Sequence, residues 1–333
     1  MTKKLDKLTI KGFKSIKELV DFELRPLNVL IGANGSGKSN FVEVFKLHTV
    51  ENWSQYVAQN GGAHAFLYNG SKETEKIEIS FSISGKTHDL TWHPTAGEIF
   101  IIWIDNTDYS SLKNLFLDNW IVYHFHDTSI TSGMRRYEII QDNEYLRQDA
   151  ANIAPFLLKL REKHKVAYSQ IVDAIRLVTP FFDDFKLTKV EMRPGEEKVR
   201  LDWTQKGSDY PMQPYHFSDG TMRFICLVTA LLQPEMPSLI IIDEPELGLH
   251  PYAINVLAEL MKSAAKKTQV IVSTQSPALV DDFEPEDVVV VNRKDGASTF
   301  ERLDKKNLKN WLKKYSLGEL WRKNVIAGGP VNE

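Results

Sequence analysis

The chain has 333 residues, of which 42% are hydrophobic and 26% charged, and its formal net charge is −3. A typical domain has about 100–150 residues, so this length allows two domains or one large two-lobed domain. The near-neutral charge argues against a strongly basic nucleic-acid-binding protein, although a local basic patch is compatible with it. Cys226 is the only cysteine, which excludes intramolecular disulfides and cysteine-ligated metal clusters and is typical of the reducing cytoplasm.

The N-terminus and the apolar runs show no sign of membrane targeting. Residues 1–8 include three lysines where a signal peptide would have an apolar core. The longest apolar runs, Leu239–Ile242 and Val288–Val291, have the length of buried strands and fall well short of the ~20 residues of a membrane helix. We therefore expect a cytoplasmic protein without a membrane partner.

Hydrophobic periodicity predicts mainly strands in the first hundred residues and mixed helices and strands after residue 150. In chain order, we expect strands at 8–10, 22–24 and 27–31, a helix at 38–48, antiparallel strands within 76–104 around a turn at 84–86, a helical stretch at 150–178, strands at 186–192 and 198–203, a helix at 219–233, a strand at 238–243, a helix at 251–266, a strand at 269–274 and a basic amphipathic helix at 304–316. The alternation of helix and strand after Pro214 predicts an α/β fold with a parallel core.

Residues 32–39 match the complete phosphate-loop pattern G-x-x-x-x-G-K-[ST] between a buried strand and a helix. Glycines let backbone N–H groups close around phosphate oxygens, and the helix N-terminus adds positive potential. Lys38 is expected to reach the β- and γ-phosphates, and the Ser39 hydroxyl to ligate Mg²⁺. We predict that ATP and Mg²⁺ bind here through Gly32, Ala33, Asn34, Gly35, Ser36, Gly37, Lys38, Ser39 and Asn40.

Two further motifs carry polar side chains at the ends of predicted elements. The apolar run Leu239–Ile242 ends in Asp243 and Glu244. A buried parallel strand would deliver Asp243 to the phosphate loop as a Mg²⁺ ligand, and Glu244 can polarise the attacking water. Ser218 and Gly220 lie at the start of an apolar helix. Ser218 is either a simple N-cap or, with the amides near Gly220, part of a second anion-binding helix end.

Five motifs follow one another along the chain: the phosphate loop and residues 218–220, 243–246, 247–251 and 273–277. This is the order of the ABC-type ATPases, and the chain more narrowly resembles the RecF/SMC/OLD-like branch of that family. Residues 124–127, 152–154 and 317–321 also make it similar to stand-alone bacterial AAA family ATPases of this branch, which are often linked to phage defence. The resemblance covers roughly residues 8–325.

The resemblance implies a single ABC-type ATPase domain over residues 1–333, with a two-lobed α/β head and a mixed sheet around the phosphate-loop helix. Residues 1–50 and 236–333 would form the nucleotide-binding lobe. Residues from about 51 to 235 would form a helical and β insertion lobe that carries the signature motif at Ser218. A loop between Trp120 and Asn152 would couple the nucleotide to the lobe interface.

The resemblance also implies a head-to-tail homodimer that encloses two ATP molecules. Each site would combine the phosphate loop, Asp243 and Glu244 of one protomer with Ser218 and Gly220 of the other. Residues 247–249 would form the loop that crosses between the two sites. For the coupling loop, Gln141 and Gln148 are equally good candidates for its glutamine.

Two residues depart from the family pattern. Asp219 stands where the signature often has glycine, and we expect it to point away or to cap the helix. Gln275 stands where many ABC ATPases have a switch histidine. Glutamine can hydrogen-bond a γ-phosphate or the water, but it cannot carry a proton charge. With Glu244 and Gln275 as the catalytic residues, we predict slow ATP hydrolysis.

The leading hypothesis is an ATP-switched dimer in DNA repair or phage defence, with a separately encoded effector such as a nuclease and with DNA or RNA as a partner. The alternative is an ATP-gated scaffold whose hydrolysis is nearly incidental. A self-contained nuclease is disfavoured because only 58 residues follow Gln275. The basic residues of 302–323 form either the solvated face of a packed helix or a contact with nucleic-acid phosphates.

Overall fold

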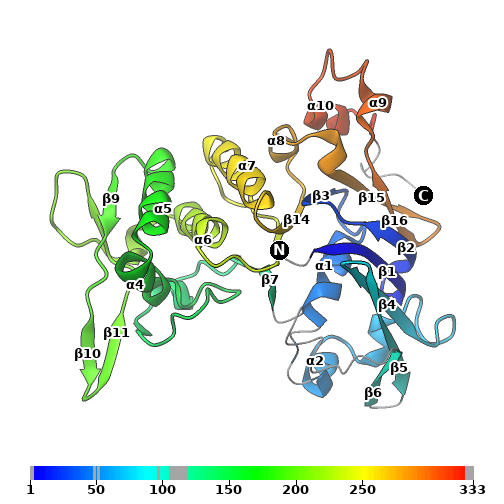
Figure 1. Cartoon of the computed structure of the whole chain (residues 1–333), viewed down its shortest axis with the longest axis horizontal. Coiled ribbons are helices and arrows are strands. Elements are labelled where there is room, and N and C mark those ends of the chain that lie inside the picture. Colours follow the sequence, from blue (N-terminus) through cyan, green and yellow to red (C-terminus); the bar gives the residue numbers. More distant parts are fainter. Residues whose placement is uncertain (1–3, 48–49, 51–52, 96–97, 105–118, 327–333) are drawn as a thin grey trace. The chain divides into compact units, whose positions relative to one another are not determined.

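The computed structural model describes residues 4–47, 50, 53–95, 98–104 and 119–326 (Figure 1). It divides into two compact units. Unit 1 comprises residues 1–122, 237–244 and 268–333, and unit 2 comprises residues 123–236 and 245–267. No helix in the described ranges has both the length and the apolar character to cross a membrane.

The central sheet of unit 1 has six strands in the order β16-β15-β3-β14-β13-β7. These strands are β3 (Leu27–Ile31), β7 (Trp120–Tyr123), β13 (Leu239–Asp243), β14 (Gln269–Thr274), β15 (Val288–Lys294) and β16 (Ala297–Arg302). Neighbours from β15 to β13 pair in parallel, and β16 pairs antiparallel with β15. All five residues of β3 and all six of β14 are buried, which is typical of parallel strands covered on both faces.

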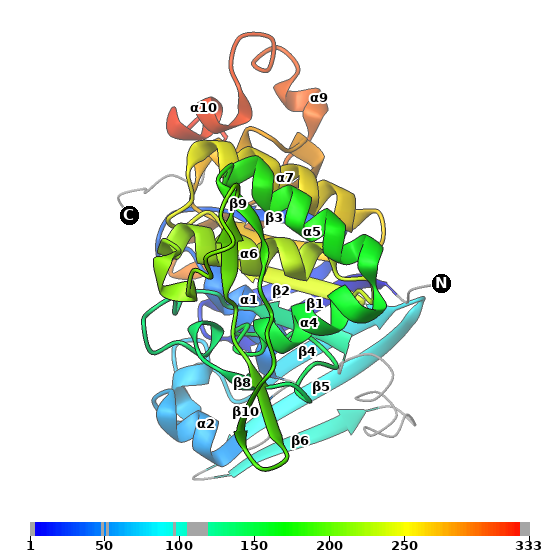
Figure 2. The ribbon, with the colours of Figure 1, turned by 90° about the vertical axis from the view of Figure 1, so that its left-hand side faces the viewer.

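A second sheet of unit 1 has the order β2-β1-β4-β5-β6, and Figure 2 shows β4, β5 and β6 side by side. Its strands are β1 (Leu5–Phe13), β2 (Ile16–Glu23), β4 (Ile77–Ile83), β5 (Lys86–Thr95) and β6 (Glu98–Ile104). Along β4, buried and half-buried residues alternate, so one face packs into the core. The helices of unit 1 are α1 (Lys38–Lys46), α2 (Trp53–Gln59), α8 (Pro277–Val280), α9 (Lys305–Leu308) and α10 (Leu317–Arg322). Aromatic side chains of α1 and both sheets share one hydrophobic core.

Unit 2 is mainly helical, with α4 packed on α5, α5 on α6 and α6 on α7. The helices are α4 (Ile153–Lys163), α5 (Lys165–Val178), α6 (Asp219–Leu232) and α7 (Pro251–Ala265), and the strands are β8 (Glu138–Ile139), β9 (Phe182–Phe185), β10 (Val190–Arg193), β11 (Glu196–Val199) and β12 (Trp203–Gln205). From Phe224 to Leu231 every residue of α6 is buried, so this helix forms the centre of the unit.

Four predicted elements are wrong in detail. The strand predicted at 186–192 is present only from Val190, in β10, because residues 186–189 connect β9 to β10 outside any strand. The helical stretch 150–178 breaks at His164, whose φ of −130° ends α4 and precedes α5. The strand predicted at 198–203 is split between β11 and β12. The basic helix predicted at 304–316 stops at Leu308, and turns follow up to α10. Lysines spaced four residues apart repel each other on a helix, which disfavours its continuation through this segment.

The compact units divide the chain at other residues than the lobes expected from the sequence. Residues 77–83 belong to unit 1 because β4 pairs along its length with β1. The predicted nucleotide-binding lobe (1–50 and 236–333) and insertion lobe (about 51–235) describe functional parts of the chain and stay a prediction. The two compact units describe how the chain packs.

Candidate nucleotide site

The predicted site residues of unit 1 follow three neighbouring parallel strands. The phosphate loop follows β3, Gln275 follows β14, and Asp243 is the last residue of β13. In the register, Ile31 lies beside Thr274 and Ser273 lies beside Asp243. The carboxyl ends of these strands therefore meet at one edge of the sheet, which is where open α/β sheets bind ligands.

The phosphate loop is shaped to receive an anion. Lys38 is 5% exposed, and its Nζ donates to the carbonyl oxygens of Gly32 at 2.7 Å and Ala33 at 3.1 Å. The helix α1 begins without a side-chain cap and without an acidic residue in its first turn, so its N-terminal positive potential is not offset there. Ser36 Oγ is buried and has no hydrogen-bond partner in the described part of the chain. These features fit phosphate oxygens.

A chain of hydrogen bonds from neighbouring segments stabilises the phosphate loop. Asn40 Nδ2 donates to Ser15 Oγ at 2.7 Å, Ser15 Oγ lies 2.6 Å from Ser298 Oγ, and Ser298 Oγ donates to the carbonyl oxygen of Ser36 at 2.6 Å. Gly37 has a φ of 111°, and a Cβ there would overlap Ser298 Oγ. Sequence reasoning missed Ser298, because it lies on β16 and no motif near it indicates contact with a loop 262 residues away.

Asp243 accepts a hydrogen bond from one hydroxyl and interacts electrostatically with the half-buried ammonium group of Lys46. Ser273 Oγ donates to Asp243 Oδ1. Burial lowers the pKa of Lys46, at the end of α1, and the charge of Asp243 opposes that shift. The Asp243 carboxylate and the exposed hydroxyl of Ser39 are hard oxygen donors of the kind that Mg²⁺ prefers.

Glu244 has a backbone conformation that only a few non-glycine residues adopt, with a φ of 46°. Its N–H donates to the carbonyl oxygen of Ser273 at 2.8 Å, which holds the turn after β13. The Gln275 Nε2 group donates to Glu244 Oε1. The two residues predicted to be catalytic thus contact each other, and such strained backbone is often found at functional sites.

In unit 2, Ser218 is the N-cap of α6. Its Oγ accepts a hydrogen bond from the Thr221 N–H at 3.1 Å and lies 2.9 Å from Thr221 Oγ1. The simple capping interpretation of Ser218 is therefore correct as local structure. Ser218 is also exposed. The Ser218 oxygen is the acceptor in the cap, and the Ser218 hydrogen is available to another partner when Thr221 Oγ1 donates in the contact between the two hydroxyls.

The residues 247–249, expected to form the crossing loop, pack against the first turns of α6. A Cβ at Gly220 would overlap the carbonyl oxygen of Gly248. Arg223 donates from Nη1 to the carbonyl oxygen of Leu247 and from Nε to that of Phe125 at 2.9 Å. Burial lowers the pKa of Arg223. Arg223 is a second residue that sequence reasoning missed.

The glycine at 220 gives the first testable prediction. Changing Gly220 to alanine forces the start of α6 away from Gly248, and overpacking of this kind costs about 1–3 kcal/mol of folding free energy. We expect a lower Tm by calorimetry, together with lower ATPase activity. The parent chain is the reference for both measurements. A Tm equal to that of the parent would contradict the close packing of Gly220 against Gly248.

The two candidates for the coupling glutamine are both exposed. The carbonyl oxygen of Gln148 accepts from the His124 N–H at 2.9 Å, and that of Gln141 accepts from the Asn143 N–H at 3.0 Å. These backbone contacts do not distinguish the two side chains. The choice between them stays open.

The sequence matches two families of AAA proteins. Residues 4–179 match the family described as "AAA ATPase domain", and residues 104–281 match the family described as "AAA domain, putative AbiEii toxin, Type IV TA system". Each match covers more than half of the chain. The chain belongs to the AAA ATPase family.

Curated proteins and solved structures resemble this AAA ATPase at lower identity. It is 21% identical over 199 residues to the chromosome partition protein Smc of Methanocaldococcus jannaschii, covering 59% of this chain and 16% of that protein. It is 42% identical over 71 residues to the ABC-type transporter ATP-binding protein EcsA of Bacillus subtilis, covering 21% of this chain and 28% of that protein. The AAA ATPase thus spans less than a third of the length of either relative.

A crystal structure of the Smc head domain with an extended coiled coil, bound to the C-terminal domain of ScpA derived from Pyrococcus furiosus, has the same fold. The TM-score is 0.67 at 14% identity, covering 94% of this chain and 99% of that chain. The predicted α/β head fold is confirmed. The resemblance to the RecF/SMC-like branch of ABC and AAA ATPases is confirmed as well.

Proposed function

We propose that this AAA ATPase is a dimeric switch that encloses ATP and Mg²⁺ between two copies of the chain and hydrolyses the ATP slowly. The observation that carries the proposal is the sheet edge where Lys38, Asp243 and the Glu244–Gln275 pair follow three adjacent strands. An enclosed site of this kind needs a second set of groups, a second phosphate grip, that binds the γ-phosphate. Ser218 and the amides near Gly220, at the exposed start of α6, would supply it from the partner protomer.

Each residue has a chemical role in this proposal. The loop amides and Lys38 bind the phosphates, and Ser36 Oγ, which is buried without a partner in the described part of the chain, gains one. Ser39 and Asp243 would hold Mg²⁺, which offsets negative charge on the phosphates when it is bound. Glu244 polarises the attacking water, and Gln275 orients Glu244 or the water.

Slow turnover follows from the chemistry of Gln275. Its amide donates to Glu244 but cannot accept a proton during the reaction, unlike a histidine. We expect a steady-state rate below about 10 per second, at the low end of enzyme turnover numbers. Phosphate release measured under saturating ATP and Mg²⁺ tests this, and a rate of several tens per second would contradict it.

For the biological setting, we propose DNA repair or phage defence with a separately encoded effector. Two names support this direction: one relative is a chromosome partition protein, and one matching family is described with a toxin–antitoxin system. The Smc head structure is bound to a domain of another protein, ScpA. An effector that docks on this AAA ATPase is the corresponding expectation.

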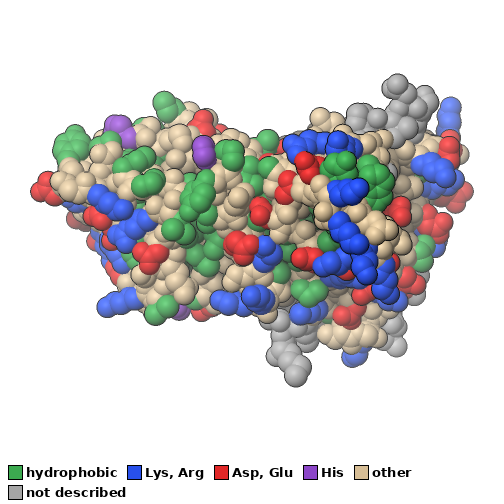
Figure 3. Space-filling view, turned by 90° about the horizontal axis from the view of Figure 1, so that it is seen from above, with side chains coloured by type: hydrophobic (Ala, Val, Ile, Leu, Met, Phe, Trp, Pro, Cys, Tyr) green, Lys and Arg blue, Asp and Glu red, His purple; other side chains and the backbone are tan. Residues whose placement is uncertain are grey.

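A basic surface supports a nucleic-acid partner. Residues 305–323 contain seven basic side chains and one acidic one, and Figure 3 shows Lys and Arg side chains gathered over α9 and α10. Five of the basic residues are exposed and form no ion pair with a described residue: Lys306, Lys309, Lys313, Lys314 and Arg322. Trp311 among them is 45% exposed, so a ring is available for base stacking beside the charges.

The alternative function is an ATP-gated scaffold whose hydrolysis is almost incidental, and Gln275 in place of a histidine is the observation that favours it. The two functions differ in their response to Glu244→Gln, which should keep ATP bound. A machine that works through hydrolysis loses its biological activity in this variant. A scaffold stays in its active closed form.

A further inference from the structure

The start of α6 carries a carboxylate where the proposed function places a phosphate. Asp219 lies in the first turn, directly after Ser218, and its side chain is 72% exposed. Two anionic groups close together repel each other. A residue that fixes and neutralises Asp219 is therefore needed if Ser218 is to meet ATP.

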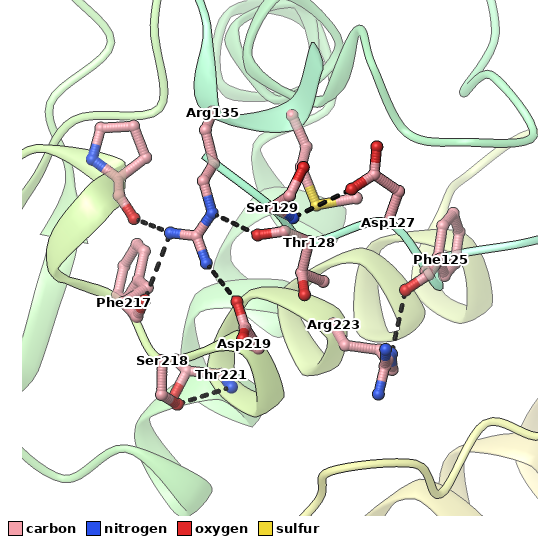
Figure 4. Close-up of polar contacts among 12 residues, drawn as sticks. Phe125, Asp127, Thr128, Ser129, Arg135, Phe217, Ser218, Asp219, Thr221 and Arg223 are labelled. Atoms are coloured by element: carbon pink, nitrogen blue, oxygen red, sulfur yellow. Dashed lines mark hydrogen bonds and ion pairs between the residues drawn. The ribbon is translucent and has the colours of Figure 1, made fainter. Parts of the chain in front are cut away.

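Arg135 satisfies this need from a separate segment of unit 2 (Figure 4). The Arg135 side chain is 4% exposed, and its Nη2 lies 3.0 Å from Asp219 Oδ1. The same group donates from Nε to the carbonyl oxygen of Thr128 at 2.8 Å, and from Nη1 to those of Pro214 and Phe217, the latter at 3.2 Å. A buried charge held by this many acceptors is costly to displace.

Arg135 contacts the residue before Ser218 and the residue after it. Phe217, whose carbonyl oxygen it binds, precedes Ser218, and Asp219, whose carboxylate it binds, follows Ser218. Only a planar group with several fixed donors can hold both neighbours and the Thr128 segment at once. The ammonium group of a lysine at 135 would make fewer of these contacts.

We propose that Arg135 is a positioning residue for the second phosphate grip. It fixes the backbone on both sides of Ser218 and neutralises Asp219, so that the Ser218 hydroxyl meets the γ-phosphate of ATP held by the partner protomer. This inference rests on the proposed function. It adds a residue that acts through Ser218 and does not itself touch the nucleotide.

The test uses the full chain carrying Glu244→Gln, in which ATP-dependent dimerisation is measured by analytical ultracentrifugation. Adding Arg135→Lys is expected to weaken dimerisation about tenfold, the size of one charge-assisted hydrogen bond. ATP affinity of the monomer should stay unchanged, because each chain binds ATP through its own phosphate loop. Arg136→Lys is the matched control, because Arg136 is the exposed neighbour.

Two further variants separate positioning from a merely structural role. With Ser218→Ala already present, Arg135→Lys should weaken dimerisation little further, because both changes remove the same interaction. Equal losses with and without Ser218→Ala would overturn the proposal. Asp219→Asn removes the carboxylate that repels the phosphate, while the amide oxygen can still accept from Arg135. Dimerisation of this variant, once thermal unfolding shows that it is folded, should be as tight as in the parent or tighter, and weaker dimerisation would overturn the neutralising role of Arg135.

The failure of this inference differs visibly from the failure of the proposed function. If the Glu244→Gln parent dimerises with ATP and Arg135→Lys dimerises equally well, the role of Arg135 is wrong and the switch stands. If the parent stays monomeric at every ATP concentration, the proposed dimer is wrong, and the role of Arg135 at the phosphate is wrong with it.

Discussion

Replacing Glu244 with glutamine is expected to lower steady-state ATP hydrolysis at least about 100-fold, the usual contribution of a general base. Glutamine has nearly the same shape and can still accept a hydrogen bond from the Gln275 amide. It cannot polarise water as a carboxylate does. ATP binding should therefore persist while turnover is lost, which is measured by phosphate release and by equilibrium binding of ATP.

Glu235→Gln is the control for this prediction, because Glu235 is an exposed glutamate outside the proposed site. It should hydrolyse ATP at the parent rate. If Glu244→Gln retained more than a tenth of that rate, another residue would have to activate the water. Loss of ATP binding in Glu244→Gln would show that Glu244 is needed to form the ATP-binding site, and not specifically to activate the water.

Changing Lys38 to alanine should have the second large effect, a loss of ATP affinity of at least about 100-fold, as expected for a desolvated charge contact with phosphate. The Nζ group of Lys38 is held by the carbonyl oxygens of Gly32 and Ala33, so it is positioned beside the loop amides. Fluorescence titration with a labelled ATP analogue measures the loss.

Lys72→Ala, a change at an exposed lysine outside the site, should bind the analogue as the parent does. Thermal unfolding without nucleotide shows whether Lys38→Ala is folded. A folded Lys38→Ala protein with parent-like ATP affinity would place the nucleotide elsewhere on the chain.

The parts of the site that local sequence predicts are those built from one element and its loop. The phosphate loop, the end of β13 and the N-cap at Ser218 each depend on residues within about a dozen positions of one another. Strand length, glycine spacing and helix capping are local properties, so a single sequence shows them.

The parts that the sequence does not predict depend on contacts between distant segments. Ser298 reaches Ser36 across 262 positions, and Arg135 reaches Asp219 across 84. Asp219 looked like a departure from the signature, and only the buried guanidinium beside it shows how the fold accommodates the charge. The prediction for the basic segment was wrong for a different reason. The spacing of its apolar residues predicted one helix over 304–316, but α9 ends at Leu308.

The central claim, that each ATP site combines two copies of the chain, is tested most directly by mixing two inactive variants. Lys38→Ala lacks the phosphate-loop lysine, and Ser218→Glu places a repelling charge at the other grip. In a mixed dimer, one site combines the phosphate loop that lacks Lys38 with the partner's altered residue 218, so it carries both defects. The other site combines the intact phosphate loop with the intact Ser218. An equal mixture should therefore recover about a quarter of the unmodified chain's hydrolysis rate, since random pairing makes half of the dimers mixed. A mixture no more active than the variants measured separately would contradict the shared site.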